Sequence, residues 1–283
     1  MDVRMDARQL IKLVVYSLLV VNFILYLADD LQASSHIMRD GDGFLKWTAS
    51  FATTIDVGAW LVLLFLFELE TYLLSDQTLD RPGVTRLMHG LRLLCYLLLT
   101  HSVYAFGIIY YDLLQVSVIE NVDQLCQLVG SNLFFVRNLE YTQLTLQNCT
   151  SLSDSSQFYL TRGGLVVTDA SGLKLETQLA LVDFLEVVFW LLILLSIEVM
   201  VRLQDRAIIR GNLVLAIKAG KILLYAALWG FAAWWLALGH FHYAWDEALW
   251  IVGFFAIEGN MAQWKREIEA SDDAATTEMA DQT

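Results

Sequence analysis

The chain contains six apolar runs of roughly 20 residues, and this pattern limits the possible fold more than any other feature. A helix of about 20 apolar residues spans the hydrocarbon core of a bilayer. Charged residues make up only 17% of the chain, against roughly 25% in soluble domains. The sequence therefore predicts an all-α polytopic membrane protein whose first helix is retained rather than cleaved. The six predicted helices cover residues 10–28, 52–75, 87–112, 180–203, 211–238 and 244–263.

Lysine and arginine are divided unevenly between the two sides of these helices. Thirteen of the eighteen basic residues lie on one side, and the remaining five are Arg39, Lys46, Arg137, Arg162 and Lys174. Because basic loops stay in the cytoplasm, we expect both termini there, in a bacterial inner membrane. The predicted organisation is helices one to three in residues 1–112, an extracytoplasmic insert in 113–179, helices four to six in 180–264, and a disordered acidic cytoplasmic tail in 265–283.

The insert, residues 113–179, is too polar for the membrane and too long for a simple loop, so it is predicted to be a small domain. Residues 115–128 have helical spacing and are predicted to extend the third helix out of the membrane. The rest is predicted to be β-rich, as a hairpin or meander with turns at 162–164 and 169–172. Its predicted strands are 134–136, 142–146, 157–161, 165–168 and 173–176.

Two cysteines fall within this insert. An oxidising compartment would join Cys126 and Cys149 in a disulfide, which stabilises a small domain by about 3 kcal/mol. The alternative is two unpaired buried thiols. Cys95, in the third predicted helix, is expected to serve only in packing.

One pattern of buried acids occurs twice in the apolar runs: an acid, three residues, a tryptophan, seven residues and a glutamate. Both copies precede a basic loop and a second apolar run. This duplication predicts a parallel repeat, with helices two and three related to helices four and five by rotation about the membrane normal. The copies are Asp56, Trp60 and Glu68, and, 130 residues later, Glu186, Trp190 and Glu198.

Ionisable side chains within apolar helices are costly and mark the candidate site. They form two predicted layers. The layer near the cytoplasmic face comprises Glu68, Glu70, Glu198 and Glu258 with His89, Arg92, Lys218 and Lys221. The layer near the outer face includes Asp56, Asp183, Glu186 and His101. Paired within the bundle, such charges are tolerable; unpaired, each costs several kcal/mol.

Three functions are compatible with these layers. The charges fasten helices in a structural, assembly or sensing protein; or they form a proton or cation path for ion transport; or the protein is a membrane redox or enzyme subunit. Haem ligation by the histidines near the outer face is considered, but the aromatic residues there are better explained as an interfacial belt. That belt comprises Trp229, Trp234, Trp235, Tyr243, Trp245 and Trp250.

The sequence contains no phosphate-binding loop, zinc-protease, serine-hydrolase or haem-attachment motif. We therefore predict no catalytic residues, no metal and no cofactor. The net charge of −13 excludes nucleic-acid binding. The expected partners are the lipid bilayer and either a second copy of the chain or another membrane protein.

Overall fold

A computed structural model describes residues 7–38, 41, 43–70, 74, 78, 81–161, 165–206 and 210–255. The described chain is mostly helical. Its helices are α1 (Ala7–Ile37), α2 (Phe44–Ser50), α3 (Ala52–Glu68), α5 (Pro82–Leu114), α6 (Ala170–Asp205) and α7 (Asn212–Ala237), followed by a helix over 241–255. Within the described residues, α1, α5, α6 and α7 are each long and apolar enough to cross a membrane, and the bent pair α2–α3 makes a fifth candidate.

These helices are consistent with an integral membrane protein. The predicted count of six spans is not confirmed, because the last predicted span, 244–263, is described only as far as residue 255. The predicted acidic tail, 265–283, lies outside the described residues. The chain divides into two compact units, Val20–Leu224 and, together, Met1–Leu19 and Tyr225–Thr283.

In the unit Val20–Leu224, α5 packs against both α3 and α6. Proline at the first turn of α5 suits a helix start, where its missing N–H would have no intrahelical partner. Small residues let the three helices approach closely. Ala52, Ala105, Phe106 and Val187 form a buried cluster. At Gly107 a Cβ would meet the ring of Phe184 at 3.3 Å, so glycine permits this contact between α5 and α6.

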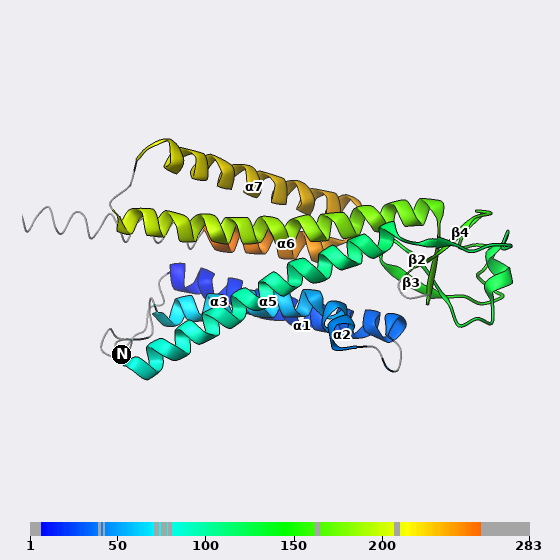
Figure 1. Ribbon diagram of the computed structural model, residues 1–283, viewed down its shortest axis with the longest axis horizontal. Coiled ribbons are helices and arrows are strands. Elements are labelled where there is room, and N and C mark those ends of the chain that lie inside the picture. The colour runs from blue at the N-terminus through cyan, green and yellow to red at the C-terminus, as the bar shows by residue number, and fades with distance from the viewer. Residues whose placement is uncertain are drawn as a thin grey trace, which may run out of the picture. The chain divides into compact units, whose positions relative to one another are not determined.

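Helices α5 and α6 are longer than a bilayer requires. With 33 and 36 residues they measure about 50 and 54 Å at 1.5 Å per residue. The hydrocarbon core is only about 30 Å thick. Both helices lead into the β-sheet at one end (Figure 1). Each helix is therefore at least about 20 Å longer than the core is thick.

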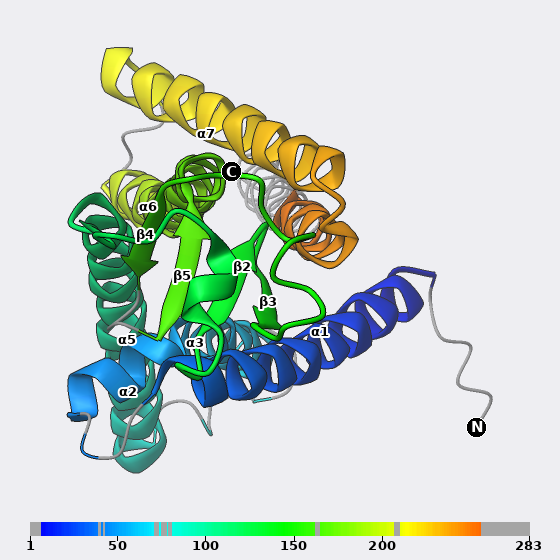
Figure 2. The same cartoon turned by 90° about the vertical axis from the view of Figure 1, so that its right-hand side faces the viewer.

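The sheet is mixed rather than the predicted hairpin or meander. Its strands are β1 (Ser117–Val118), β2 (Phe134–Arg137), β3 (Glu140–Gln143), β4 (Phe158–Thr161) and β5 (Val166–Asp169), in the order β1-β4-β5-β2-β3. Figure 2 looks onto this end of the molecule and shows β5 beside β2. The strands β2 and β5 are parallel, and all the other pairs are antiparallel. The domain core comprises Leu125, Leu128, Leu133, Phe135, Leu144, Phe158 and Val167.

Three predictions about the insert are wrong. Residues 115–128 do not extend α5, which ends at Leu114; they form β1 and a 3₁₀ turn at Leu125–Leu128. The predicted turn at 169–172 is the end of β5 and the start of α6, and the predicted last strand, 173–176, also belongs to α6, which begins at Ala170. The four predicted strands before it correspond to β2, β3, β4 and β5, with shifted ends. The predicted turn at 162–164 lies outside the described residues.

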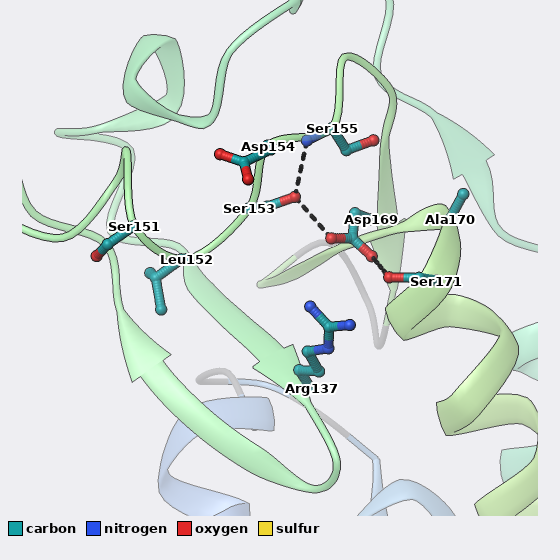
Figure 3. A pocket seen from close by; sticks show the side chains of 9 residues that line it. All are labelled: Arg137, Ser151, Leu152, Ser153, Asp154, Ser155, Asp169, Ala170 and Ser171. Carbon is teal, nitrogen blue, oxygen red and sulfur yellow. Dashed lines mark hydrogen bonds between the residues drawn. The ribbon is translucent and has the colours of Figure 1, made fainter.

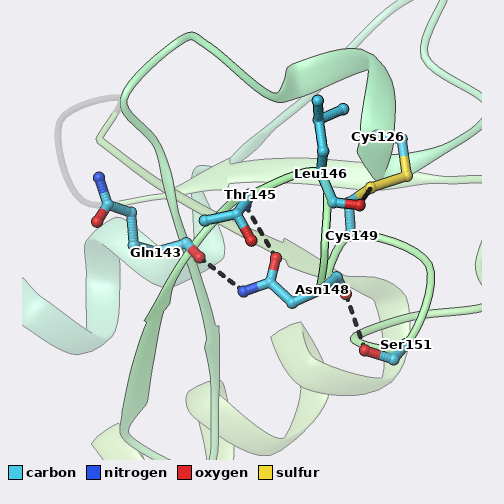
Figure 4. Close-up of a disulfide and its surroundings, with 7 residues drawn as sticks. All are labelled: Cys126, Gln143, Thr145, Leu146, Asn148, Cys149 and Ser151. Carbon is cyan, nitrogen blue, oxygen red and sulfur yellow. Dashed lines mark hydrogen bonds between the residues drawn. A yellow bond between two sulfur atoms is a disulfide. The ribbon is translucent and has the colours of Figure 1, made fainter.

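The predicted disulfide between Cys126 and Cys149 is present (Figure 4). It joins the 3₁₀ turn to the turn that follows β3. That second turn is also held by Asn148, whose side chain accepts a hydrogen bond from the Thr145 backbone N–H (2.9 Å) and donates one to the Gln143 carbonyl (2.8 Å). The remaining cysteine, Cys95, is buried with a free thiol.

Candidate functional site

The two tryptophans of the repeated pattern are in contact. The rings of Trp60 in α3 and Trp190 in α6 meet edge to face, with centroids 6.1 Å apart. Residues four apart share one face of a helix. Asp56 and Glu186 therefore lie one turn before the contact, on the faces of α3 and α6 that carry the tryptophans. Both acids are half-buried and interact with other groups.

Other predicted members of this layer lie on α5 and α6. Asp183, on α6, is half-buried and also interacts with other groups. The ring of His101, on α5, packs against Tyr104 with centroids 6.1 Å apart. Its Nε2 atom is buried without a hydrogen-bond partner among the described residues. This is an unsatisfied polar atom within a membrane-spanning segment.

At the other end of α3, an ion pair joins two helices. The chain continues past Glu68 through a π turn at residues 69–70. There Glu70 Oε2 accepts a hydrogen bond from Arg92 at 2.5 Å. The two side chains are 29% and 35% exposed, so the pair is substantially screened from water by protein. It fastens the end of α3 to the first half of α5.

A second ion pair lies within α6. Arg202 donates to Glu198 Oε1 from both Nη2 (2.9 Å) and Nε (3.1 Å). The phenol of Tyr96, on α5, is within electrostatic range of Glu198 and Arg202 and also of Arg92. We call the five residues Glu70, Arg92, Tyr96, Glu198 and Arg202 the inner charge cluster.

The structure does not bring every predicted residue of this layer into the cluster. Glu68 and Lys221 are half-buried and interact with other groups, whereas His89 and Lys218 are exposed. Glu258 lies outside the described residues. Glu198 pairs with an arginine on its own helix, whereas Glu70 pairs with Arg92 of α5.

One contact between helices was missed in the sequence. Asp30 of α1 accepts hydrogen bonds through Oδ2 from the backbone N–H (2.9 Å) and hydroxyl (2.7 Å) of Thr54, on α3. We expected residue 30 to lie in a loop, but α1 continues to Ile37. The sequence did contain a signal that the helix continues past residue 28. Asn22, Tyr26 and Ser34, which are buried, share a four-residue spacing with Asp30, as residues on one face of a helix do.

The junction of β5 and α6 is built around one buried carboxylate (Figure 3). Asp169 Oδ1 accepts hydrogen bonds from the Gly172 backbone N–H and the Ser171 hydroxyl, both at 2.7 Å, and Oδ2 accepts one from Ser153 at 2.6 Å. Burial raises the pKa of Asp169, but these hydrogen bonds and the charge of Arg137 outweigh it and lower the pKa below 3.8. The ionised carboxylate therefore caps α6 and holds the loop that contains Ser153.

This junction borders an open cleft of about 440 Å³. Its lining is polar and includes Arg137, Asp154 and several serines (Figure 3). The hydrogen bonds of Asp169 are made within the protein, to the loop and to the helix end. The carboxylate at the base of the cleft therefore has a structural role in joining the domain to α6.

A second buried carboxylate extends the junction by two helical turns. Glu176 of α6 is 2% exposed, and its Oε1 accepts a hydrogen bond from the Leu139 backbone N–H at 3.0 Å. Leu139 and Asn138 form the tight turn between β2 and β3, both with positive φ. Gly172 lies between the two carboxylates, where a Cβ would overlap the Thr168 hydroxyl. The first turns of α6 are thus packed as part of the β domain.

The predicted aromatic belt is only partly exposed. In the unit that contains residues 225–255, Trp235 is buried and packs against His240 and Tyr243, with centroids 5.4 and 5.1 Å away. Trp250 is also buried, whereas Trp229 and Trp245 are exposed. Both histidines here contact the ring of Tyr243, His240 by stacking and His242 in a tilted arrangement. No group of three or more potential metal ligands occurs among the described residues.

Comparison with protein-family models, with curated proteins and with solved structures gives no match. The function must therefore be inferred from the chemistry of the chain itself. Two arrangements stand out: a β domain that passes into α6 through buried carboxylates, and an inner charge cluster on the same helix.

Proposed function

We propose that this protein is an integral membrane component of the sensing or assembly type, in which an extracytoplasmic β domain is coupled through α6 to the inner charge cluster. One observation carries the proposal: β5 ends at Asp169 and α6 begins at Ala170, with no linker between them. The other connection is also short, since only residues 115 and 116 separate α5 from β1. A domain held in this way cannot turn independently of its helices.

The packing of α6 supports the transmission of movement. Asp169 caps the helix, and Glu176 ties its second turn to the β2–β3 turn. From there the helix continues without a break to Asp205. A push or rotation of the domain, by a ligand or a partner protein, would therefore displace α6 as a rigid element.

A displacement of α6 would alter the contacts of the inner charge cluster. Glu198 and Arg202 lie on α6, while Arg92 and Tyr96 lie on α5. A small shift of α6 along α5 would change which arginine each glutamate meets. Exchange between alternative ion pairs would give the helices two discrete arrangements. Coupling between two sites requires an element with two such arrangements.

The proposed topology has six spans, with both termini in the cytoplasm of a bacterial cell and the β domain outside. The disulfide supports this placement, because structural disulfides persist in oxidising compartments. Leu146, which is 79% exposed in the domain, is a suitable reporter position. A membrane-impermeant thiol reagent should label Leu146→Cys in intact cells. Labelling only after lysis would contradict the topology.

The parallel repeat is part of the proposal. Contact between Trp60 and Trp190, which occupy corresponding positions in the two copies, supports it. In an experimental structure, α3 with α5 should superpose on α6 with α7, and Glu68 should lie at the same depth as Glu198. Different depths for the two glutamates would make the repeated pattern a coincidence.

Transmission can be tested on the whole protein in lipid nanodiscs. An antibody fragment raised against the disulfide-closed domain supplies the perturbation, and hydrogen exchange of residues 194–205 in α6 supplies the readout. The fragment should change exchange in that segment. A variant with two glycines inserted after Asp169 should bind the fragment equally well but lose the response. Equal responses in both proteins would overturn the coupling.

Ion or proton conduction is the alternative proposal. It is favoured by the acids beside the tryptophan contact and by the unsatisfied Nε2 of His101, which are ionisable groups within the helices. Purified protein in liposomes with pH- or potential-sensitive dyes separates the two functions. A sensing or assembly protein should give no flux. Flux in the wild type that disappears in Glu198→Gln, with the fold retained, would establish conduction instead.

A further inference from the structure

The short helix α2 has an apolar face that nothing in the described protein covers. Phe44, Leu45 and Trp47 are 75%, 60% and 45% exposed. Thr48, one turn after Phe44, is buried, and Ala49 packs against the cluster that joins α3, α5 and α6. The helix therefore contacts the protein through Thr48 and Ala49 and leaves three large hydrophobic side chains exposed.

The position of α2 relative to the membrane follows from α3. With 17 residues, α3 measures about 26 Å, close to the roughly 30 Å of the hydrocarbon core. Its first residue, Ala52, therefore lies near the boundary of the core. Phe51 alone separates α2 from α3, and the two helices are bent by 72°. Consequently α2 lies at that boundary and runs close to the membrane plane.

The side of the membrane is fixed by packing within the same unit. Ala52 belongs to one cluster with Ala105 and Phe106 of α5, near the end that leads into the β domain. Therefore α2 lies at the leaflet nearer the domain. A helix of seven residues measures about 10 Å, too short to enter the membrane and return.

The exposed aromatic rings form a continuous row. Phe44 stacks on Trp47 with centroids 6.2 Å apart, and Trp47 packs against Phe51 at 5.0 Å. Aromatic rings, tryptophan above all, favour the boundary between headgroups and acyl chains. Further along α3, Phe65 is also exposed, at 58%. Lipid already covers such surfaces in a membrane-spanning helix.

We propose that α2 is an interfacial anchor, whose exposed side chains Phe44, Leu45 and Trp47 insert between the headgroups and acyl chains of the leaflet on the domain side. The occupant of this face is phospholipid. A short helix with one apolar face binds lipid in this way, with that face about 5–10 Å into the boundary region. The anchor holds the start of α3 at a fixed depth beside α5.

Spin-label accessibility in nanodiscs tests the depth. On a Cys95→Ala background, single labels are placed at Leu45, at Leu97 in the middle of α5 (60% exposed) and at Leu146 in the β domain (79% exposed). Collision rates are then measured with oxygen, which concentrates in lipid, and with a water-soluble nickel chelate. The label at Leu45 should fall between the deep label at Leu97 and the aqueous label at Leu146.

Two results would overturn the anchor. Accessibility at Leu45 equal to that at Leu146 would place α2 in water. Protection of Leu45 from both reagents would mean that a protein partner or a second copy covers the face.

Tryptophan fluorescence tests the same proposal with a smaller change to α2. The difference between the emission spectra of the wild type and Trp47→Phe gives the emission of Trp47 alone. Bromines placed near the headgroup end of the lipid chains should quench it more than bromines near the chain ends, and the reverse order would also contradict the proposal.

Discussion

Replacement of Asp169 by alanine should loosen the β domain from α6. The carboxylate is 4% exposed and receives three hydrogen bonds of 2.6–2.7 Å. A hydrogen bond to a charged group contributes about 1.5–3 kcal/mol, and a helix cap about 1 kcal/mol, but contributions that share one carboxylate do not add. We therefore expect a loss of about 3 kcal/mol, which is roughly a 150-fold increase in local opening.

Hydrogen exchange of the peptide that covers β5, residues 166–169, measures this opening in the intact protein. Asp154→Ala is the matched control, because Asp154 is an exposed carboxylate on the same cleft. Its effect should stay within about 0.5 kcal/mol. If Asp169→Ala changes protection of β5 by less than about fivefold, the carboxylate does not hold the junction.

The same carboxylate makes stability depend on pH. The pKa of Asp169 is lowered in the folded protein, so the folded state favours the ionised form. Its stabilisation is therefore fully present well above the ordinary pKa of 3.8 and is lost as pH falls through the lower, folded value. Protection of β5, corrected for intrinsic exchange, should fall below about pH 4 in the wild type. An equal fall in Asp169→Ala would show that another group is responsible.

Three further substitutions test the packing and the charges. Gly172→Ala should lower the free energy of unfolding by about 1–3 kcal/mol, because the added Cβ would overlap the Thr168 hydroxyl. Gly90→Ala is the control: its Cβ would have no neighbouring atom within 4 Å, so the melting temperature should not fall. In thermal-shift assays, Glu70→Gln should destabilise the protein and the further change Arg92→Leu should recover much of the loss; no recovery would mean that the pair is not a fastener. Serine at both disulfide cysteines should cost about 3 kcal/mol, measured by protease resistance of the domain, and unchanged resistance would contradict this.

The membrane class and the disulfide could be predicted from the sequence because both depend on short-range signals. Apolar run length marks the helices, and two cysteines in one polar segment leave a single pairing. The start of α6 could not be predicted in this way. Residues 173–176 alternate in polarity like a strand, and the helix there depends on the cap from Asp169 and on burial of Glu176 against the sheet. Those contacts exist only in the folded domain.

The ion pairs could not be predicted from the sequence. Spacing along the helices identified Glu70, Arg92 and Glu198 as residues of one layer. It could not show that Glu70 pairs with Arg92, or that Glu198 pairs with Arg202 on its own helix. Pairing depends on helix rotation and on which side chains reach across. Asp30 was missed for a related reason, since the end of α1 was placed too early.

The central claim is that the β domain and α6 move as one body, and a distance measurement between them tests it most directly. On a Cys95→Ala background, spin labels at Gln143 in β3 and at Leu195 in α6, both exposed, report the distance by pulsed electron resonance in nanodiscs. The native protein should give one narrow distribution, and two glycines inserted after Asp169 should broaden it. A broad distribution in the native protein, or one that the insertion leaves unchanged, would contradict rigid coupling.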